Sequence, residues 1–456
     1  MSILTAILIG LLLTVSPKPD ESLKTIRETG ELRVLTRNNP TTYYEGADGP
    51  TGFDYDLVKG FADSLKVRLR LMPASGTDAV LTALQRGDAH LAAAGIKVTP
   101  EHMEKARFGA IYQSIQEQLV YRDHPGHHPP QTLQDVVDKR FEVAAHSSYA
   151  ATLRGLSTDY PALTWRENSR GRSGELMALV WERALDYTIA DSNEIALSRS
   201  AYPELRVAFN IGEPKHLAWA FPLQADESLC LYRAALRYFD RIQKNGQLDQ
   251  LIERHYGHVE RFDYVGTRRF LAHMNERLPR YLKHFQHAAE HHGLDWRLLC
   301  AIGYQESHWN EQAISPTGVR GIMMLTQDTA AQVGIKNRLD AKQSIDGGAR
   351  YFASLKTRIP KEVSEPDRTW FALAAYNIGL GHLEDARRFA DEGGSNANRW
   401  VDVKKFLPLL SKQEWSAKTR YGYARGEEPV SYVQSVRRYF DWLVRADKQN
   451  SLLATR

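Results

Sequence analysis

The feature of this sequence that most constrains its fold is a change in the spacing of apolar residues near position 266. Before that position, short β-rich runs alternate with helical patterns; Val67–Leu71, for example, precedes the helical pattern of Thr77–Arg86. Such alternation is typical of α/β layers with largely parallel sheets. From about Gly266 onward the strand patterns disappear and helical patterns follow one another. We therefore expect an α/β domain followed by an all-α domain.

Residues that typically begin, end or interrupt helices and strands support this division. A run rich in proline and histidine near Tyr121–Pro130 interrupts the first part, which predicts an α/β domain of two lobes. In the second part, Asp295 is placed to cap a helix, and Gly293 and Gly379 are placed to end helices. A length of 456 residues suits two or three domains. The expected boundaries are residues 17–265 for the α/β domain and 266–456 for the helical domain.

An apolar run from Ile3 to Val15 occupies the N-terminus. Its length fits the apolar region of a signal peptide and is short for a helix that spans a bilayer. No cysteine follows the run, which excludes a lipid attachment site there. We expect an exported protein with peripheral membrane association, in which residues 1–16 are either a signal peptide or an N-terminal anchor.

The composition excludes some classes of partner. Hydrophobic residues make up 43% of the chain, charged residues 25%, and the formal net charge is +4, which is ordinary for a globular protein and no sign of nucleic-acid binding. The two cysteines, Cys230 and Cys300, stand among apolar residues and are expected to be buried free thiols. The sixteen histidines have no partners at zinc spacing. No metal and no cofactor are expected.

One carboxylate in the helical part stands in an unusual place. Counting back from Glu306 by three and four residues gives Gly303, Ile302 and Leu298, so Glu306 shares a helix face with apolar residues. A carboxyl group held against apolar neighbours loses hydration in its charged form, and its pKa should rise. Glu306 is thus a candidate general acid near neutral pH, of the kind that glycoside cleavage needs.

Other clusters accompany Glu306, and each taken singly is more often core or loop than functional. One has glycines that let the backbone approach a ligand closely, followed by flexible apolar side chains. A second places an aromatic ring and an amide at a helix end. The others present aromatic faces of the kind that stack on sugar rings. They are Gly318-Val-Arg-Gly321-Ile-Met-Met324, Ala374-Ala-Tyr376-Asn377-Ile-Gly379, Tyr421-Gly-Tyr423 and Tyr432-Val433.

In this order the clusters resemble the soluble-lytic-transglycosylase family of lysozyme-like enzymes, over the whole helical part. The resemblance implies an all-α lysozyme-like fold with Glu306 as the catalytic residue. Met324 departs from the family, which usually has glutamine there, so a hydrogen bond to an N-acetyl group is in doubt at this position. The residues that the resemblance assigns to substrate binding are Ser307, Ser315, Met323, Met324, Tyr376, Asn377, Tyr421 and Tyr432.

The implied reaction cleaves peptidoglycan glycan strands between N-acetylmuramic acid and N-acetylglucosamine and leaves a 1,6-anhydro end. Near Glu306 in sequence, Glu311 and Asp328 are the candidates for a second carboxylate, and neither lies on a comparable apolar stripe. A single-acid mechanism assisted by the substrate therefore fits better. Two alternatives stay open: a lysozyme-type hydrolase, and a ligand-binding or sensor protein whose helical domain is inactive.

The α/β part resembles the family-3 solute-binding proteins, two-lobed periplasmic receptors for amino acids, over residues 31–258. The matching segments are Gly52-Phe-Asp-Tyr-Asp56-Leu, Ala83-Leu-Gln-Arg-Gly87-Asp88, Val98-Thr99-Pro100-Glu101 and Asp191-Ser192. Residue 102 is histidine where those receptors have an arginine that clamps the ligand carboxylate.

The resemblance gives this domain four candidate ligand-binding residues, Asp56, Thr99, His102 and Asp191. We expect a regulatory domain that binds a muropeptide or stem peptide and controls access to Glu306. The alternative is a scaffold that binds nothing. The expected location is the periplasm, at the periphery of the outer membrane.

Overall fold

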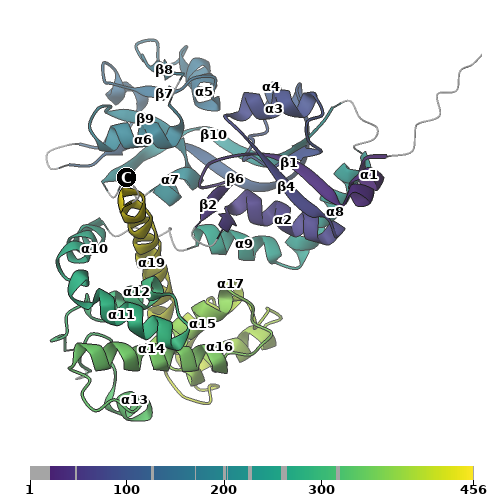
Figure 1. Ribbon diagram of the computed structural model, residues 1–456. Coiled ribbons are helices and arrows are strands. Elements are labelled where there is room, and N and C mark those ends of the chain that lie inside the picture. The colour runs from purple at the N-terminus through teal and green to yellow at the C-terminus, as the bar shows by residue number, and fades with distance from the viewer. Residues whose placement is uncertain are drawn as a thin grey trace, which may run out of the picture. The chain divides into compact units, whose positions relative to one another are not determined.

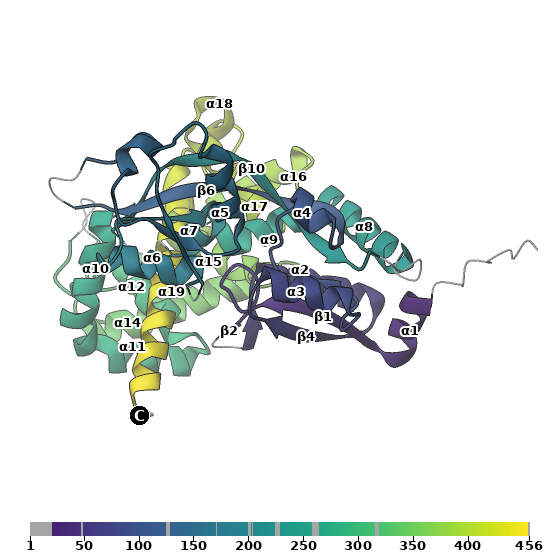
Figure 2. The same ribbon diagram turned by 90° about the horizontal axis from the view of Figure 1, so that it is seen from above.

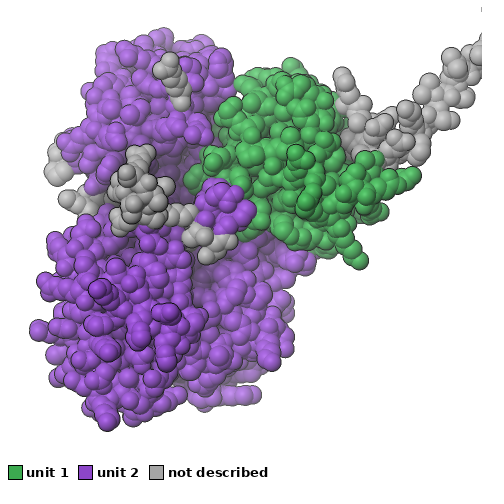
Figure 3. Space-filling view, viewed as in Figure 1, with its two compact units in different colours: residues 1–43, 54–113, 216–242 green, residues 44–53, 114–215, 243–456 purple. Residues whose placement is uncertain are grey.

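The computed structural model describes residues 21–46, 49–124, 128–169, 171–198, 202, 204–223, 229–257, 264–314 and 319–454. These residues belong to two compact units (Figure 3). Unit 1 comprises residues 1–43, 54–113 and 216–242, and unit 2 comprises residues 44–53, 114–215 and 243–456. The expected signal peptide or anchor, residues 1–16, lies outside the described residues. Among the residues described, no helix is long and apolar enough to cross a membrane.

Unit 1 is an α/β layer. Strand β1 pairs in parallel with β4 and β5, and β5 pairs antiparallel with the end of β10 (Leu205–Phe221) at Ala220. Helix α3 packs on this sheet and buries Val80, Leu81 and Leu84 against it. The elements are α1 (Glu21–Thr29), β1 (Glu31–Arg37), α2 (Phe53–Leu65), β4 (Arg68–Ala74), α3 (Thr77–Gln85), β5 (Leu91–Ala92), α4 (Pro100–Met103) and α8 (Leu229–Lys244).

Unit 2 contains a second α/β portion. Strands β6 and β9 pair antiparallel, whereas β7 and β8 form a separate two-stranded parallel sheet. Helices α5 and α6 pack against β7, and α6 also packs against β9. The elements are β2 (Tyr44–Gly46), β3 (Gly49–Thr51), η1 (Leu133–Val136), β7 (Glu142–Ala144), α5 (Ser148–Leu156), β8 (Arg166–Asn168), α6 (Ser173–Trp181), β9 (Tyr187–Asp191), α7 (Ser192–Ser198), and most of β6 (Arg107–Arg122) and β10, whose residues 107–113 and 216–221 belong to unit 1.

From Tyr264 onward the described chain is helical, as the spacing of apolar residues predicts. Asp295 caps α12 by accepting a hydrogen bond from the Arg297 amide, and Gly293 ends α11 in the left-handed conformation. The helices are α10 (Tyr264–Glu276), α11 (Leu278–His292), α12 (Trp296–Ser307), α13 (Gln327–Gln332), α14 (Ala341–Arg358), α15 (Asp367–Ile378), α16 (Leu380–Glu392), α17 (Trp400–Val403), η3 (Leu407–Ser411), α18 (Gln413–Ser416) and α19 (Glu427–Ala454).

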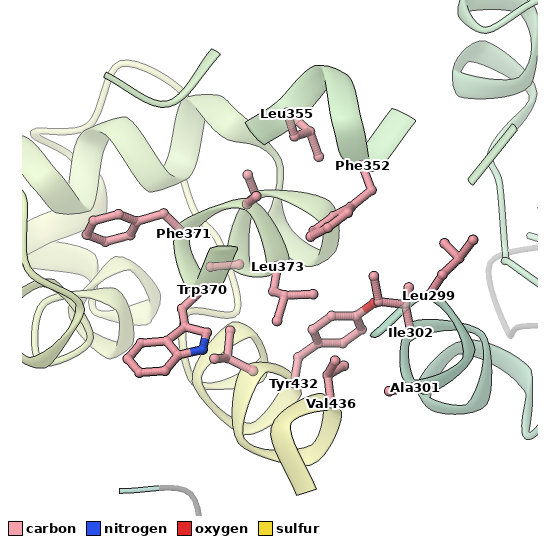
Figure 4. Packing of buried hydrophobic residues seen from close by; sticks show 14 of the residues in the cluster. Leu299, Ala301, Ile302, Phe352, Leu355, Trp370, Phe371, Leu373, Tyr432 and Val436 are labelled. Carbon is pink, nitrogen blue, oxygen red and sulfur yellow. The ribbon is translucent and has the colours of Figure 1, made fainter. Parts of the chain in front are cut away.

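One apolar core joins these helices. The long α19 runs alongside α12 and α15, while α11 lies against both α12 and α14 (Figures 1 and 2). Figure 4 shows Ile302 of α12, Phe352 of α14 and Tyr432 of α19 meeting in this core. Because α12 is buried along most of its length, its last turn is held firmly in place. That turn carries Glu306.

A buried ion pair ties α9 (Gln247–Tyr256) to the helical portion. The Glu253 carboxylate accepts hydrogen bonds from Arg437 at 3.0 Å and from Lys404 at 2.6 Å. The Arg437 guanidinium also lies over the Trp370 ring, 3.9 Å from its centroid. Glu253 and Arg437 are 5% and 6% exposed. Although the expected boundary at residue 265 assigns α9 to the α/β domain, this helix is held by residues of the helical portion.

Candidate active site

Glu306 lies in the last turn of α12 and is half-buried. The helix ends at His308, which takes a left-handed conformation with φ of 52°. Gly303, one turn before Glu306, has no space for a side chain: a Cβ there would lie 2.8 Å from the Phe285 ring and 3.1 Å from the Met323 sulfur. The backbone around Glu306 is therefore packed closely on two sides.

The Glu306 carboxyl group has a raised pKa. Burial raises its pKa from the ordinary 4.5 to about 7, and the hydrogen bond from Tyr432 partly opposes this rise. The direction agrees with the expectation from the apolar stripe on α12. A carboxyl group with this pKa is protonated in a large share of molecules at neutral pH, so it can donate a proton and later take one up.

Tyr432 of α19 fixes the orientation of Glu306. Its hydroxyl donates a hydrogen bond of 2.6 Å to Glu306 Oε1, and its side chain is buried. The ring of Tyr376 stacks on that of Tyr432, with centroids 6.5 Å apart and an angle of 20° between the planes. Burial raises the pKa of both tyrosines well above the usual value, and the charge of Glu306 adds to this. Both phenols therefore stay protonated and act as hydrogen-bond donors.

A tight turn, Gly321–Met324, is tied to α12 by Ser307 and to α15 by Tyr376. Ser307 Oγ donates to the Ile322 carbonyl at 2.8 Å, and Tyr376 Oη donates to the Met323 carbonyl at 3.0 Å. Gly321 has φ of +91°, and a Cβ there would lie 2.1 Å from the Arg338 carbonyl oxygen. Only glycine fits this position without displacing the turn.

The two methionines of this turn differ in their surroundings. Met323 is 0% exposed and lies against Gly303 and Gly348, so its side chain belongs to the core. Met324 is half-buried and has φ of +46°, which is uncommon for a residue with a side chain. The turn thus buries Met323 in the core and leaves Met324 partly accessible, at the position where the family usually has glutamine.

Farther along the chain, an aromatic loop is fixed by a residue that the sequence did not reveal. The buried Asp385 accepts backbone hydrogen bonds of 3.0 Å from Arg420 and 3.2 Å from Tyr421. Tyr421 and Tyr423 are nevertheless 62% and 63% exposed. Asp385 stands on a helical pattern without any local mark of function, so only the folded structure identifies it. Asn377, at the end of α15, is exposed as well.

The remaining candidates are placed as follows. Ser315 lies outside the described residues. Thr99 caps α4 and accepts a hydrogen bond of 3.2 Å from the His102 amide, while His102 Nδ1 lies 2.8 Å from the Lys97 carbonyl oxygen. Asp56, Thr99 and His102 belong to unit 1, and Asp191, the last residue of β9, belongs to unit 2.

Comparisons with known proteins find a family model that matches each of the two parts of the chain. The model of the transglycosylase SLT domain matches residues 283–398, which include Glu306, Tyr376 and Asn377. The model of the bacterial extracellular solute-binding proteins, family 3, matches residues 32–258. Among solved structures, a mutant of ArgBP from T. maritima is 20% identical, covers 52% of this chain and 99% of its own, and has a TM-score of 0.45.

Relatives match almost the whole chain. Membrane-bound lytic murein transglycosylase F 1 of Alkalilimnicola ehrlichii is 49% identical over 94% of this chain and 86% of its own length. Membrane-bound lytic murein transglycosylase F of Ectopseudomonas mendocina is 46% identical over 96% of this chain and 90% of its own. The match includes the α/β part as well as the helices around Glu306. The chain belongs to the family of membrane-bound lytic murein transglycosylases F.

Proposed function

We propose that this chain is a peptidoglycan lytic transglycosylase that acts in cell-wall turnover, with Glu306 as its acid and base. The observation that carries this proposal is the half-buried Glu306, with a pKa of about 7 and a hydrogen bond from Tyr432. The names of its relatives support murein as the substrate.

The proposed reaction has two proton transfers. Protonated Glu306 gives its proton to the glycosidic oxygen between N-acetylmuramic acid and N-acetylglucosamine as the bond from C1 to that oxygen breaks. The acetamido oxygen of the same muramic acid bonds to C1 and stabilises the positive charge. The Glu306 carboxylate then takes the proton of the C6 hydroxyl as O6 bonds to C1 and displaces the acetamido oxygen. No water is consumed, and Glu306 returns to its protonated form. Such acid–base catalysis typically contributes about 10²–10⁴-fold in rate.

The electrostatics of Glu306 favour one carboxylate over two. Two-carboxylate glycosidases place the second group about 5–9.5 Å from the first, and a charge that close would raise the pKa of Glu306 further. The raised pKa of Glu306 instead has burial as its cause, with no contribution from a second carboxylate of the described residues. Asp328 is exposed in the first turn of α13, and Glu311 bonds to the Tyr281 hydroxyl. This supports the lyase over a lysozyme-type hydrolase.

The candidate substrate-binding residues divide into two groups in this proposal. Met324, Asn377 and Tyr421 contact the glycan, since their side chains are at least partly exposed. The other residues position parts of the site without contacting the glycan. Ser307, Met323 and Tyr376 position the Gly321–Met324 turn, and Tyr432 positions Glu306. Ser315 stays a proposal from the resemblance.

The test is the variant Glu306→Gln, assayed by clearing of purified peptidoglycan. Loss of clearing with unchanged unfolding behaviour is expected. Clearing at the wild-type rate would contradict the assignment of Glu306. A folded variant at the exposed Glu362 (Glu362→Gln) serves as the matched control, because it removes the same charge from a loop.

We also propose that the solute-binding part binds a muropeptide or stem peptide and regulates the enzyme through Asp56, Thr99, His102 and Asp191. The match of residues 32–258 to the solute-binding proteins supports a ligand. Calorimetric titration with a stem peptide, on the wild type and on Asp191→Asn, tests this. Tight binding that weakens in the variant is expected, together with a changed clearing rate. Equal binding by both proteins, or none by the wild type, would contradict it.

The proposed location is the periplasm, at the periphery of the outer membrane, with residues 1–16 as signal peptide or anchor. The family's name supports membrane association. Fractionation of cells that express the full chain, with sequencing of its N-terminus, tests both points. Recovery in the soluble cytoplasmic fraction would contradict them.

A further inference from the structure

A basic pocket of about 300 Å³ lies in the α/β portion of unit 2, apart from every residue assigned above. It lies where β6 ends and β9 begins, since Tyr121 of β6 is paired with Tyr187 of β9. Its lining residues are Arg122, His124, Lys139, Arg140, Val180, Arg183, Leu185, Asp186 and Tyr187. Four of these are permanent cations and one is a carboxylate, which leaves an excess of three positive charges.

The single carboxylate neutralises one of the cations. Asp186 accepts two hydrogen bonds from the Arg140 guanidinium, of 3.1 and 2.6 Å, and a third from the Arg140 amide. Within the part of the chain that the structure describes, no carboxylate forms an ion pair with Arg122, Lys139 or Arg183. The Arg140 hydrogen bonds lower the pKa of the Asp186 carboxyl, and the charge of Lys139 helps to lower it, so Arg122 and Arg183 are the cations of the pocket that Asp186 compensates least.

Arg122 is held in place by contacts with Trp181. One of its terminal nitrogens donates to the Trp181 carbonyl, and its guanidinium lies over the Trp181 ring, 5.6 Å from the centroid. Its Nε is buried and has no hydrogen-bond partner in the described residues. A guanidinium has five N–H donors, so Arg122 is oriented by protein contacts and still keeps donors for a ligand.

Arg183 occupies a position that favours glycine. It follows α6 with φ of +66°, and its amide bonds to the Val180 carbonyl at 3.1 Å, as in a helix end closed by a left-handed residue. Arginine has no conformational advantage there. The side chain instead adds one of the exposed cations to the pocket.

We propose that this pocket binds a phosphate ester. A carboxylate is satisfied by one guanidinium, whereas several cations around one small pocket suit the oxygens of a phosphate group. Val180, Leu185 and Tyr187 line the pocket but are buried, so the ligand would contact mainly its charged side chains. The ligand is either a soluble phosphate ester or the headgroup of an anionic phospholipid, since both present the same chemistry.

The test uses the full chain and the double variant Arg183→Gly with Lys139→Gln. Glycine suits the backbone at 183, and both side chains are exposed, so this variant should fold as the wild type does. Arg166→Gln is the matched control, because it removes an exposed cation of β8 outside the pocket. Calorimetric titration with glycerol 3-phosphate should show binding by the wild type, at least tenfold weaker binding by the double variant, and a change below twofold in the control.

Vesicles distinguish the two sources of the phosphate ester. Sedimentation with phosphatidylglycerol vesicles, reduced in the double variant and absent with phosphatidylcholine, would assign the pocket to a lipid headgroup. Binding of glycerol 3-phosphate without any effect of the variant on vesicles would assign it to a soluble ester. The proposal is overturned if the wild type binds neither probe, or if the double variant binds both as the wild type does.

Discussion

The raised pKa of Glu306 predicts that this residue lowers the stability of the fold at neutral and alkaline pH. The folded protein binds this proton more tightly than the unfolded chain, because the pKa is about 7 in the fold and 4.5 ordinarily. The free energy of unfolding therefore falls as the pH rises from below 4.5 to above 7. At about 1.4 kcal/mol per pKa unit, the fall amounts to about 3 kcal/mol.

Replacing Glu306 by glutamine removes this dependence, because glutamine keeps the shape of the neutral acid and can still accept the Tyr432 hydrogen bond. Urea unfolding followed by tryptophan fluorescence should give similar stabilities for Glu306→Gln and the wild type at pH 4. At pH 8 the variant should be more stable by about 3 kcal/mol. The exposed Glu362→Gln should show no such gain. A stability difference between Glu306→Gln and the wild type that is the same at both pH values would refute the reasoning.

Three further predictions follow from contacts of the helical portion. Removing the Tyr432 hydroxyl (Tyr432→Phe) should raise the pKa of Glu306, so the fall in rate at alkaline pH should begin at a pH about one unit higher. A fall at the same pH as in the wild type would argue against the hydrogen bond. Glu253→Gln should lower the free energy of unfolding by about 3–5 kcal/mol in urea titrations, because it removes the buried carboxylate that accepts hydrogen bonds from both Arg437 and Lys404; a variant as stable as the wild type would show that the pair is dispensable. Gly321→Ala should abolish clearing of peptidoglycan, since its Cβ would collide with a carbonyl oxygen, whereas Gly394→Ala, also at positive φ but in open space, should retain it; equal activity of the two variants would contradict the role of the turn.

Sequence patterns predicted the helical portion well, because its signals are local. The cap at Asp295, the stop at Gly293 and the apolar stripe that ends at Glu306 each depend on residues within two turns of one another. The same stripe correctly predicted the direction in which the pKa of Glu306 moves.

Strand predictions were less complete. The long strand β6 (Arg107–Arg122) was not predicted, since its buried and exposed residues do not alternate regularly along its length. Strand β10 (Leu205–Phe221) is likewise much longer than the short β-rich runs expected in this part of the chain. Pairing with neighbouring strands determines where a strand begins and ends, and this pairing is hard to predict from a single sequence.

The contacts that position the site could not be predicted either, because they join residues far apart in the chain. Tyr432 and Glu306 are 126 residues apart, and Arg437 and Glu253 are 184 apart. Asp385, which holds the loop of Tyr421, stands on an ordinary amphipathic helix. A local pattern marks which residues are polar and buried, while only the fold shows which of them meet.

The most direct test of the central claim is mass spectrometry of the soluble products released from purified peptidoglycan. A single Glu306 that acts as acid and then as base, with the C6 hydroxyl as nucleophile, predicts muropeptides lighter by one water than the corresponding reducing-end species. Glu306→Gln should release none of them. Products with reducing ends from the wild type would contradict the mechanism and show that a water molecule, activated by a second carboxylate, attacks the sugar.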